Sequence, residues 1–244
     1  MKADAIRTRE PLTRPRELGR DPLPVGLPPW PGPPVLWAAR TTAPDPELLD
    51  TAALDPGERR RAAGFRSGAD RVAYTVAHVA LRRLLGGILA VDPARIRYTR
   101  EPCPGCGGPH GRPAVRGAPV HFSLSRTRGL VLLAFAGHPI GADVERLPSQ
   151  ARLERLTPAL HAHEQAQLAA LPPGARAGAF VRCWTRKEAW LKGTGEGIGT
   201  RLTAATLVGA GTRPLQRPGW RLADIAAPEG FAAAYAVRTA PPQR

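Results

Sequence analysis

The sequence has few cysteines, few aromatic side chains and no long uninterrupted apolar run. Three cysteines in 244 residues are too few, and an odd number, for a disulfide framework. Phe, Trp and Tyr make up 5% of the chain and seldom alternate with Arg, which argues against a surface that stacks nucleic-acid bases. No apolar run reaches the ~18 residues that span a bilayer, and the N-terminus does not resemble a secretory signal. We therefore expect a cytoplasmic protein with no membrane partner.

Acidic residues are scarce beside basic ones. Lys and Arg number 35 against 20 Asp and Glu, for a net charge of +15. Residues 57–128 alone contain 14 Arg against four acids, so an anionic partner should dock on this part of the chain. Hydrophobic residues make up 43%, which excludes a wholly disordered chain. The length fits one large domain or two small ones.

The first 34 residues hold nine prolines and six Lys or Arg without a periodic apolar pattern. Such a segment buries little surface to offset its ordering entropy, so we expect residues 1–34 to be a mobile tail. Order should begin with a strand over 34–40. The run 55–58 is typical of a helix start. A second helix is predicted over 68–89, where one apolar stripe leaves Arg82 outside it.

The order of the remaining elements indicates an α+β fold of two halves. Later segments are predicted as strands at 95–100, 120–136 and 140–147, helices at 156–171 and 175–192, and strands at 202–208, 218–225 and 230–238. A strand, then helices, then strands thus occurs twice. We divide the chain accordingly into residues 35–138 and residues 139–244, on element order alone because the residues themselves do not repeat.

Two carboxylates lie two residues apart in the predicted strand at 140–147. Strand side chains alternate, so Asp143 and Glu145 point to the same face. Like charges held together repel unless a cation lies between them, and carboxylate oxygens suit Mg²⁺. The pattern is also compatible with a solvated edge strand, because D-x-E is common.

A second charged group lies on the predicted helix at 175–192. Trp184, Glu188 and Lys192 are spaced to share one face, with Lys187 about 100° around the helix from Glu188. A carboxylate between two ammonium groups could serve at an anionic site. An ordinary surface Glu–Lys pair is the alternative.

Two loops could bind other ligands. Ser125 and Arg126 lie near a predicted turn, where hydroxyl, guanidinium and amide groups could hold a phosphate, although a polar hairpin turn is the simpler interpretation. The loop at 103–113 contains Cys103, Cys106 and His110, three of the four ligands of tetrahedral zinc. Since no fourth ligand is nearby in the sequence, a plain Gly/Pro loop is favoured. The alternative is a metal knuckle in a basic nucleic-acid-binding protein.

Taken together and in order, these pieces resemble the Sfp-type 4′-phosphopantetheinyl transferases. The family's motifs are a G-[KR]-P loop, F-x-x-S before a polar turn, G-x-D-x-E, and W-x-x-K-E-A-x-x-K-x-x-G. The sequence matches them at Gly111–Pro113, Phe122–Ser125, Gly141–Glu145 and Trp184–Gly195. The last two motifs, about 40 residues apart, are the most specific part of the resemblance.

The resemblance implies a pseudo-dimeric α+β fold that transfers the phosphopantetheine arm of coenzyme A to a serine of an acyl or peptidyl carrier protein, releasing 3′,5′-ADP. Three acids would be Mg²⁺ ligands: Asp143, Glu145 and Glu188. Two cations would contact the phosphates beside a catalytic Glu188: Lys187 and Lys192. The residues expected to contact coenzyme A are Arg112, Pro113, Ser125 and Arg126. Ser125 would lie near the 3′-phosphate, and the loop Gly111–Pro113 near the adenine. The family implies a monomer, and the basic segment suits an acidic carrier protein rather than nucleic acid.

The sequence departs from the family pattern at three positions. Ser123 and Arg126 stand where the family usually has Asn and His, and His78 stands where it often has Arg. An Arg can bind phosphate but cannot act as a base, because it does not deprotonate. These departures leave open a catalytically degenerate protein that serves as a carrier-binding scaffold.

Overall fold

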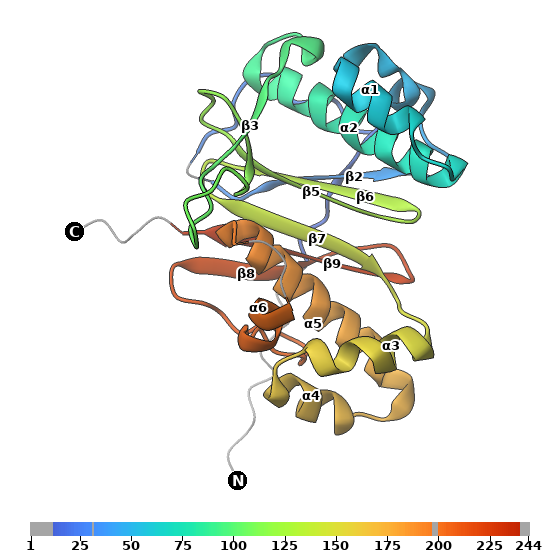
Figure 1. Ribbon diagram of the computed structural model, residues 1–244, viewed down its shortest axis with the longest axis vertical. Coiled ribbons are helices and arrows are strands. Elements are labelled where there is room, and N and C mark those ends of the chain that lie inside the picture. Colours follow the sequence, from blue (N-terminus) through green and yellow to red (C-terminus); the bar gives the residue numbers. More distant parts are fainter. Residues whose placement is uncertain (1–11, 31, 197–199, 240–244) are drawn as a thin grey trace, which may run out of the picture.

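The computed structural model describes residues 12–30, 32–196 and 200–239, and the side chains of these except at 200–202. Helices and strands form four layers (Figure 1). The helices are α1 Pro56–Ala63, α2 Gly68–Leu89, α3 Gln150–Leu156, α4 Ala162–Ala169, α5 Pro173–Thr194 and α6 Thr200–Ala205. The strands are β1 Arg16–Glu17, β2 Val35–Arg40, β3 Tyr98–Arg100, β4 Pro113–Val115, β5 His121–Thr127, β6 Leu130–Ala136, β7 Ile140–Arg146, β8 Trp220–Ile225 and β9 Phe231–Arg238.

The first two layers are the helices α1 and α2 and a sheet of order β1-β2-β6-β5-β4-β3. Neighbouring strands are antiparallel except for the short parallel pair β1–β2. Burial of the stripe from Ala77 to Ile88 packs α2 onto this sheet, against Trp37 and Phe135. The helix has the length and apolar composition of a membrane span, but most of it is buried, as in the core helix of a globular domain.

The other two layers are a sheet of order β7-β9-β8 and the helix α5 with α3 and α4. The two sheets pack face to face through the side chains of β6, β7 and β9, among them Leu132, Val144 and Tyr235. Helix α5 approaches β7 closely, because a Cβ at Gly141 would lie 2.0 Å from the carbonyl oxygen of Ala189. The α+β class is confirmed.

The described part of the N-terminal segment is not a mobile tail. Residues 12–30 lie along both sheets: β1 pairs with β2, and Thr13 forms a bridge to Ile225 of β8. Leu18 is buried, and Trp30 packs against the first core. A few backbone bonds and the apolar side chains Leu18, Leu23 and Trp30 therefore anchor a proline-rich segment that has no periodic pattern of its own. Residues 1–11 of the predicted tail lie outside the described residues.

Two other predicted elements differ in the structure. The helix expected over 156–171 begins only at Ala162, as α4, because Pro158 lies in a short 3₁₀ turn before it, and α3 over 150–156 was not predicted. Proline lacks the N–H that would continue the helix. The strand expected over 202–208 is not formed: residues up to 205 belong to α6, and residues 206–208 have no regular structure. Elsewhere the helix over 68–89 and the strands around 121–127 and 130–136 are confirmed.

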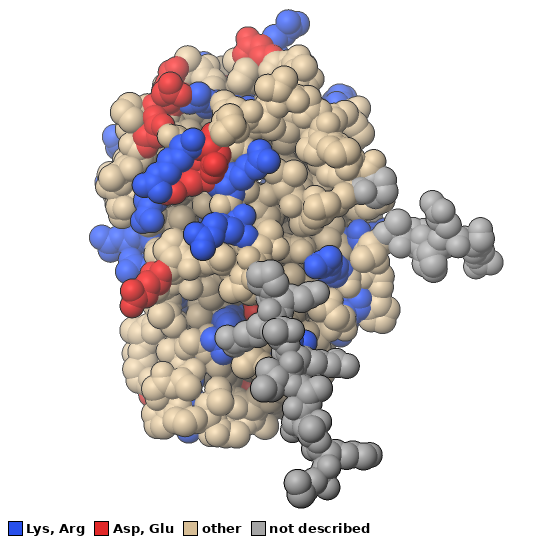
Figure 2. All heavy atoms as spheres, turned by 180° about the vertical axis from the view of Figure 1, so that it is seen from behind, with Lys and Arg blue, Asp and Glu red and all other residues tan. Residues whose placement is uncertain are grey.

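On the face shown in Figure 2, surface charge is mixed rather than gathered in one basic patch. In Figure 2, Lys and Arg are spread over one face of the molecule, and several lie beside acids. Exposed pairs include Arg83 with Glu47 at 2.5 Å and Arg20 with Glu17 at 2.7 Å. Such exposed pairs contribute little to stability, but they neutralise part of the excess positive charge.

Candidate active site

Strand β7 and helix α5 bring the three predicted acids together. Asp143 and Glu145 come from β7, and Glu188 comes from α5, close enough for its charge to interact with both of theirs. Oδ1 of Asp143 accepts hydrogen bonds from Ser125 Oγ at 2.7 Å and from Lys192 Nζ at 2.5 Å. Oδ2 of Asp143 is buried without a partner among the described residues. A buried carboxylate oxygen without a partner is costly, so this atom is available to a ligand.

The electrostatics show that this group of acids is short of positive charge. Burial raises the pKa of Glu188 to about 7, and the charges of Asp143 and Glu145 add to this effect against Lys192. Burial also raises the pKa of Glu145, again with help from the charge of Asp143. Carboxylates whose charges oppose one another in this way favour binding of a cation.

The three acids are suitable ligands for a magnesium ion. Among the described residues, the one compact group of three candidate ligands lies elsewhere, so the three carboxylates do not form a closed metal cage by themselves. Mg²⁺ rarely needs such a cage: it usually takes one or two carboxylates and completes its shell with substrate phosphates and water. Asp143 Oδ2 and the carboxylates of Glu145 and Glu188 supply suitable hard oxygen donors.

A cavity of about 550 Å³ adjoins the acids. Lys192 belongs to both, because it lines the cavity and also pairs with Asp143. Part of the lining comes from the end of the β3–β4 loop, including the predicted Arg112 and Pro113. Tyr98 lines the cavity as well, and its buried hydroxyl has no partner among the described residues. The cavity thus joins apolar walls to cationic and hydroxyl groups.

Arg112 links the two halves of the molecule at this cavity. Its guanidinium pairs with Glu101 and donates to the carbonyl oxygen of Gly193, near the end of α5. The chain turns at Gly195, where φ is +81° and a Cβ would lie 3.1 Å from Cγ of Arg112. Glycine therefore allows the end of α5 to pack against the loop.

Lys187 does not reach the cavity, which corrects the expected phosphate contact. Its ammonium group is wholly buried and pairs with Glu164 at 2.6 Å. It also donates to the carbonyl oxygens of Thr203, at 2.9 Å, and Thr206. The 100° between adjacent helical residues turns Lys187 toward the interior while Glu188 faces β7.

Ser125 and Arg126 lie on opposite faces of β5. The Ser125 hydroxyl is buried among Asp143, Lys192 and the N–H of Val144, so it holds the acid in place and is not free for a phosphate. Arg126 is exposed on the other face, with its guanidinium over the rings of Phe65 and Tyr74. Neither residue lines the cavity beside Lys192.

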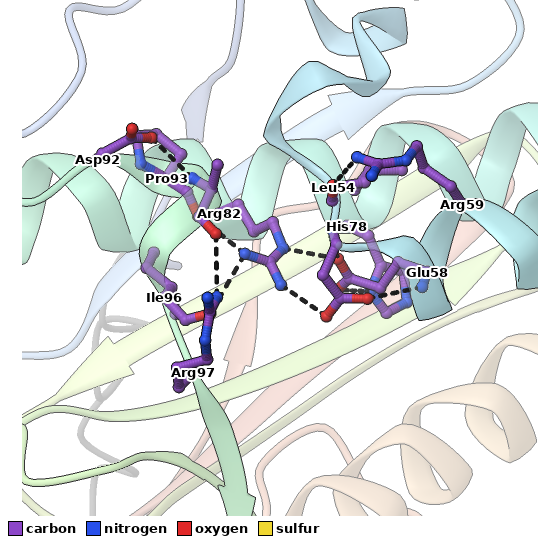
Figure 3. A network of polar contacts seen from close by, with 11 residues as sticks. Leu54, Glu58, Arg59, His78, Arg82, Asp92, Pro93, Ile96 and Arg97 are labelled. Atoms are coloured by element: carbon purple, nitrogen blue, oxygen red, sulfur yellow. Dashed lines mark hydrogen bonds and ion pairs between the residues drawn. The ribbon is translucent and has the colours of Figure 1, made fainter.

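A polar network under the cavity was missed by the sequence analysis (Figure 3). His78 lines the cavity, stacks on Tyr74 and contacts Glu58 at 3.2 Å. Arg82, expected outside the apolar stripe, is wholly buried and pairs with Glu58 and Asp55. The acids at 55 and 58 also form the capping box of α1. The sequence features that could have indicated this network are the capping pattern and the spacing of His78 and Arg82, four residues apart on the next helix.

Comparison with known proteins points to one enzyme family. Residues 139–229 match the sequence profile described as the 4′-phosphopantetheinyl transferase superfamily. The chain is 32% identical over 212 residues to the 4′-phosphopantetheinyl transferase HetI of Nostoc sp., covering 83% of this chain and 86% of that protein. It is 24% identical over 146 residues to the 4′-phosphopantetheinyl transferase Sfp of Bacillus subtilis, covering 59% and 62%. The chain therefore belongs to the 4′-phosphopantetheinyl transferases, the enzymes that transfer the phosphopantetheine group of coenzyme A to carrier proteins.

Proposed function

We propose that transfer in this protein is magnesium-dependent, takes place beside Asp143, Glu145 and Glu188, and releases 3′,5′-ADP. The serine oxygen of the carrier protein forms a bond to the phosphorus that bears the pantetheine arm. The bond from that phosphorus to the bridging oxygen of the pyrophosphate breaks, and 3′,5′-ADP leaves. When bound, Mg²⁺ supplies positive charge to the pyrophosphate oxygens.

The observation that carries this proposal is the unequal use of the two oxygens of Asp143. Oδ1 is held by Ser125 and Lys192, whereas Oδ2 is buried and unpartnered. The first contact fixes the carboxylate, and the second atom is left to a cation beside the cavity. An acid with a purely structural role would have both oxygens bonded.

Each remaining residue has a role that follows from its position. Lys192 neutralises Asp143 and, from the cavity wall, donates to a phosphate oxygen of coenzyme A. Arg112 and Pro113 also line the cavity and contact the adenine side. Ser125 is a positioning residue for Asp143, and Lys187 supports the fold.

Glu188 is the residue that accepts the proton of the carrier serine. It is 7% exposed, and it lies on the helix face that carries Lys192, one turn away. A carboxylate there can receive the proton directly or through water as the serine attacks the phosphorus. The same carboxylate would also be one of the ligands of Mg²⁺.

The test is mass spectrometry of an apo carrier protein incubated with coenzyme A and Mg²⁺. Wild-type protein should add one phosphopantetheine group, and chelation of Mg²⁺ should stop the reaction. Glu188→Gln should abolish transfer and leave coenzyme A binding largely intact, while the exposed Glu154→Gln in α3 serves as the matched control. Unimpaired turnover by Glu188→Gln would refute the assigned role. Transfer by the wild type would also exclude a degenerate carrier-binding scaffold.

The partner that we propose is an acidic acyl or peptidyl carrier protein, bound by a cytoplasmic monomer. The excess of Arg over acids in residues 57–128 supports this, and we expect no nucleic-acid partner. Salt should then weaken carrier docking by screening the charges. An apparent carrier affinity that does not change with salt would contradict this docking.

The pseudo-dimeric relation of the two halves, residues 35–138 and 139–244, is also a proposal. Each half has a 22-residue helix packed on the outer face of its own sheet: α2 in the first and α5 in the second. The sheets meet face to face, and the cavity lies where the halves join. A duplicated architecture would explain why one site draws its residues from both.

A further inference from the structure

One cluster of potential ligands lies outside the carboxylate site, in the loop between β3 and β4. The sulfurs of Cys103 and Cys106 and a ring nitrogen of His110 all lie within 4.8 Å of one another. Tetrahedral zinc with bonds of about 2.3 Å to sulfur and about 2.0 Å to nitrogen places its ligands about 3.5–3.8 Å apart. Small side-chain adjustments would therefore suffice to bring the three atoms around one ion.

The backbone of this loop turns both cysteines toward one point. The N–H of Cys103 donates to the carbonyl oxygen of Gly108 at 2.8 Å, and the N–H of Gly107 donates to the carbonyl oxygen of Cys103 at 2.7 Å. The N–H groups of Gly105 and Cys106 point at the Cys103 sulfur. Gly107 has a φ of +72°, which glycine adopts without strain. These amides hold the Cys103 sulfur in place beside the other two donor atoms.

Gly108 passes between the candidate ligands. A Cβ at this position would lie 3.0 Å from Cδ2 of His110 and 3.4 Å from the Cys106 sulfur. The Cys106 sulfur itself is 3.0 Å from Nε2 of His110. A side chain here would require His110 to shift by a few tenths of an ångström, so glycine lets the backbone run close to both side chains.

The ends of the loop are fixed, but its middle has little core of its own. The N–H of Gly111 donates to the carbonyl oxygen of Glu101 at 3.0 Å, and the N–H of Glu101 donates to that of Arg112 at 2.9 Å. Between these anchors, Cys103 and Gly111 are the buried residues. A segment with so few apolar side chains is a place where a metal would supply the missing stabilisation.

We propose that this loop binds a zinc ion through Cys103, Cys106 and His110, with the fourth position open to solvent. Cys106 and His110 are exposed, which leaves room for an oxygen ligand on that side. Cys183 takes no part, because it is buried in the second core on α5. This proposal interprets the segment as a metal-binding loop, whereas the sequence alone favours a plain Gly/Pro loop.

The site adjoins the cavity described above. His110 lines the cavity, and the chain continues from it through Gly111 to Arg112 and Pro113. A zinc ion would therefore hold the wall that we assign to the adenine side of coenzyme A. Its own existence does not depend on that assignment.

The experiment measures metal in the full chain, purified without a histidine tag from zinc-supplemented cells. Elemental analysis should find about one zinc per wild-type chain. Cobalt(II) added to the metal-free protein should give the visible bands of tetrahedral coordination and a thiolate-to-cobalt charge-transfer band. Cys106→Ser should lower zinc occupancy at least tenfold at limiting zinc and remove the charge-transfer contribution of that sulfur.

Cys183→Ser and His163→Gln are the matched controls, and both should keep the zinc. Far-ultraviolet circular dichroism shows whether Cys106→Ser remains folded. If it does not, His110→Gln, at an exposed position, takes its place. Wild-type protein that is folded and free of zinc, zinc content unchanged by the ligand variants, or a Cys103–Cys106 disulfide found by mass spectrometry would each overturn the proposal.

Discussion

Lys187 and Lys192 lie five residues apart on α5, yet their surroundings differ in kind. Lys187 and its partner Glu164 are both wholly buried. Two carbonyl oxygens accept from the ammonium group, and the N–H groups of Val208 and Gly209 donate to the carboxylate at 2.8 Å and 3.0 Å. Every strong donor and acceptor of this pair is used.

Lys192 and Asp143 form a pair that is not closed. The lysine is 25% exposed and faces the cavity, and one oxygen of Asp143 has no partner among the described residues. Two further acids lie near Asp143 with raised pKa values, chiefly because they are buried. The difference distinguishes a structural ion pair from a functional one. In the structural pair, all hydrogen-bonding groups have partners within the protein, whereas the functional pair keeps an oxygen that can bind a ligand.

The largest effect on stability is expected from breaking the closed pair. Lys187→Met leaves Glu164 buried without its counter-charge, so the free energy of unfolding should fall by roughly 3–5 kcal/mol. Urea unfolding followed by tryptophan fluorescence measures this change. Transfer by the remaining folded protein should persist. If Lys187→Met kept its stability but lost transfer, Lys187 would instead have the phosphate contact expected from the sequence.

Replacing Lys192, which pairs with Asp143, should have the opposite effect: transfer should fall and stability should change little. Lys192→Met removes a donor to the phosphates, so transfer should fall roughly 10²–10³-fold. The lysine is 25% exposed, and Asp143 keeps its hydrogen bond from Ser125. Unfolding by urea should change far less than in Lys187→Met. Initial rates of carrier modification give the activity. A variant that loses stability instead of rate would show that this pair, too, is structural.

The comparison also depends on how closely α5 approaches β7, and Gly141→Ala tests that distance. A Cβ there would lie 2.0 Å from the carbonyl oxygen of Ala189 and 2.3 Å from the nitrogen of Gly193, so the helix must move away. Overpacking of this kind costs roughly 1–3 kcal/mol, and transfer should fall because Glu188 moves relative to Asp143. Gly174→Ala, in open space at the start of α5, is the control and should keep full activity. Thermal unfolding and rates together measure both effects.

Elements with a strong local pattern could be predicted from the sequence. The apolar stripe gave the bounds of α2, and the cap at Asp55 gave the start of α1. The N-terminal segment could not be predicted, because Leu18 and Trp30 are ordered by contacts with distant parts of the chain. Contacts of that kind have no period for a sequence analysis to find.

The acids of the site could be predicted because alternation along β7 and spacing along α5 determine which way they face. The same alternation separates Ser125 from Arg126 and could have been applied there. The environment of Lys187 could not have been predicted, since its partner Glu164 lies on another helix, 23 residues earlier in the chain. Tertiary packing alone decides which of two neighbouring lysines is buried.

The number of hydrogen-bond and ion-pair partners of a buried carboxylate also determines the direction of its pKa shift. Glu58 in the first half of the chain allows a test. Burial alone would raise the pKa of Glu58, as it does for Glu188. Hydrogen bonds from His78 and from the N–H of Asp55, together with Arg82, outweigh burial and lower it. A carboxyl group with a lowered pKa in the folded state stabilises the protein at pH values above its ordinary pKa, and this stability is lost as the pH falls through the folded value.

Glu58→Gln should therefore be less stable than wild type at neutral pH, and the two should converge as the pH falls below about 4.5, the ordinary pKa of the group. Urea unfolding across a series of pH values gives the two curves. Glu47→Gln, at an exposed partner of Arg83, is the control and should follow the wild type closely. Curves for Glu58→Gln and wild type that stay parallel into acid would mean that Arg82 does not stabilise the charged carboxylate. In that case, saturation by neighbouring donors would no longer account for the opposite shifts of Glu58 and Glu188.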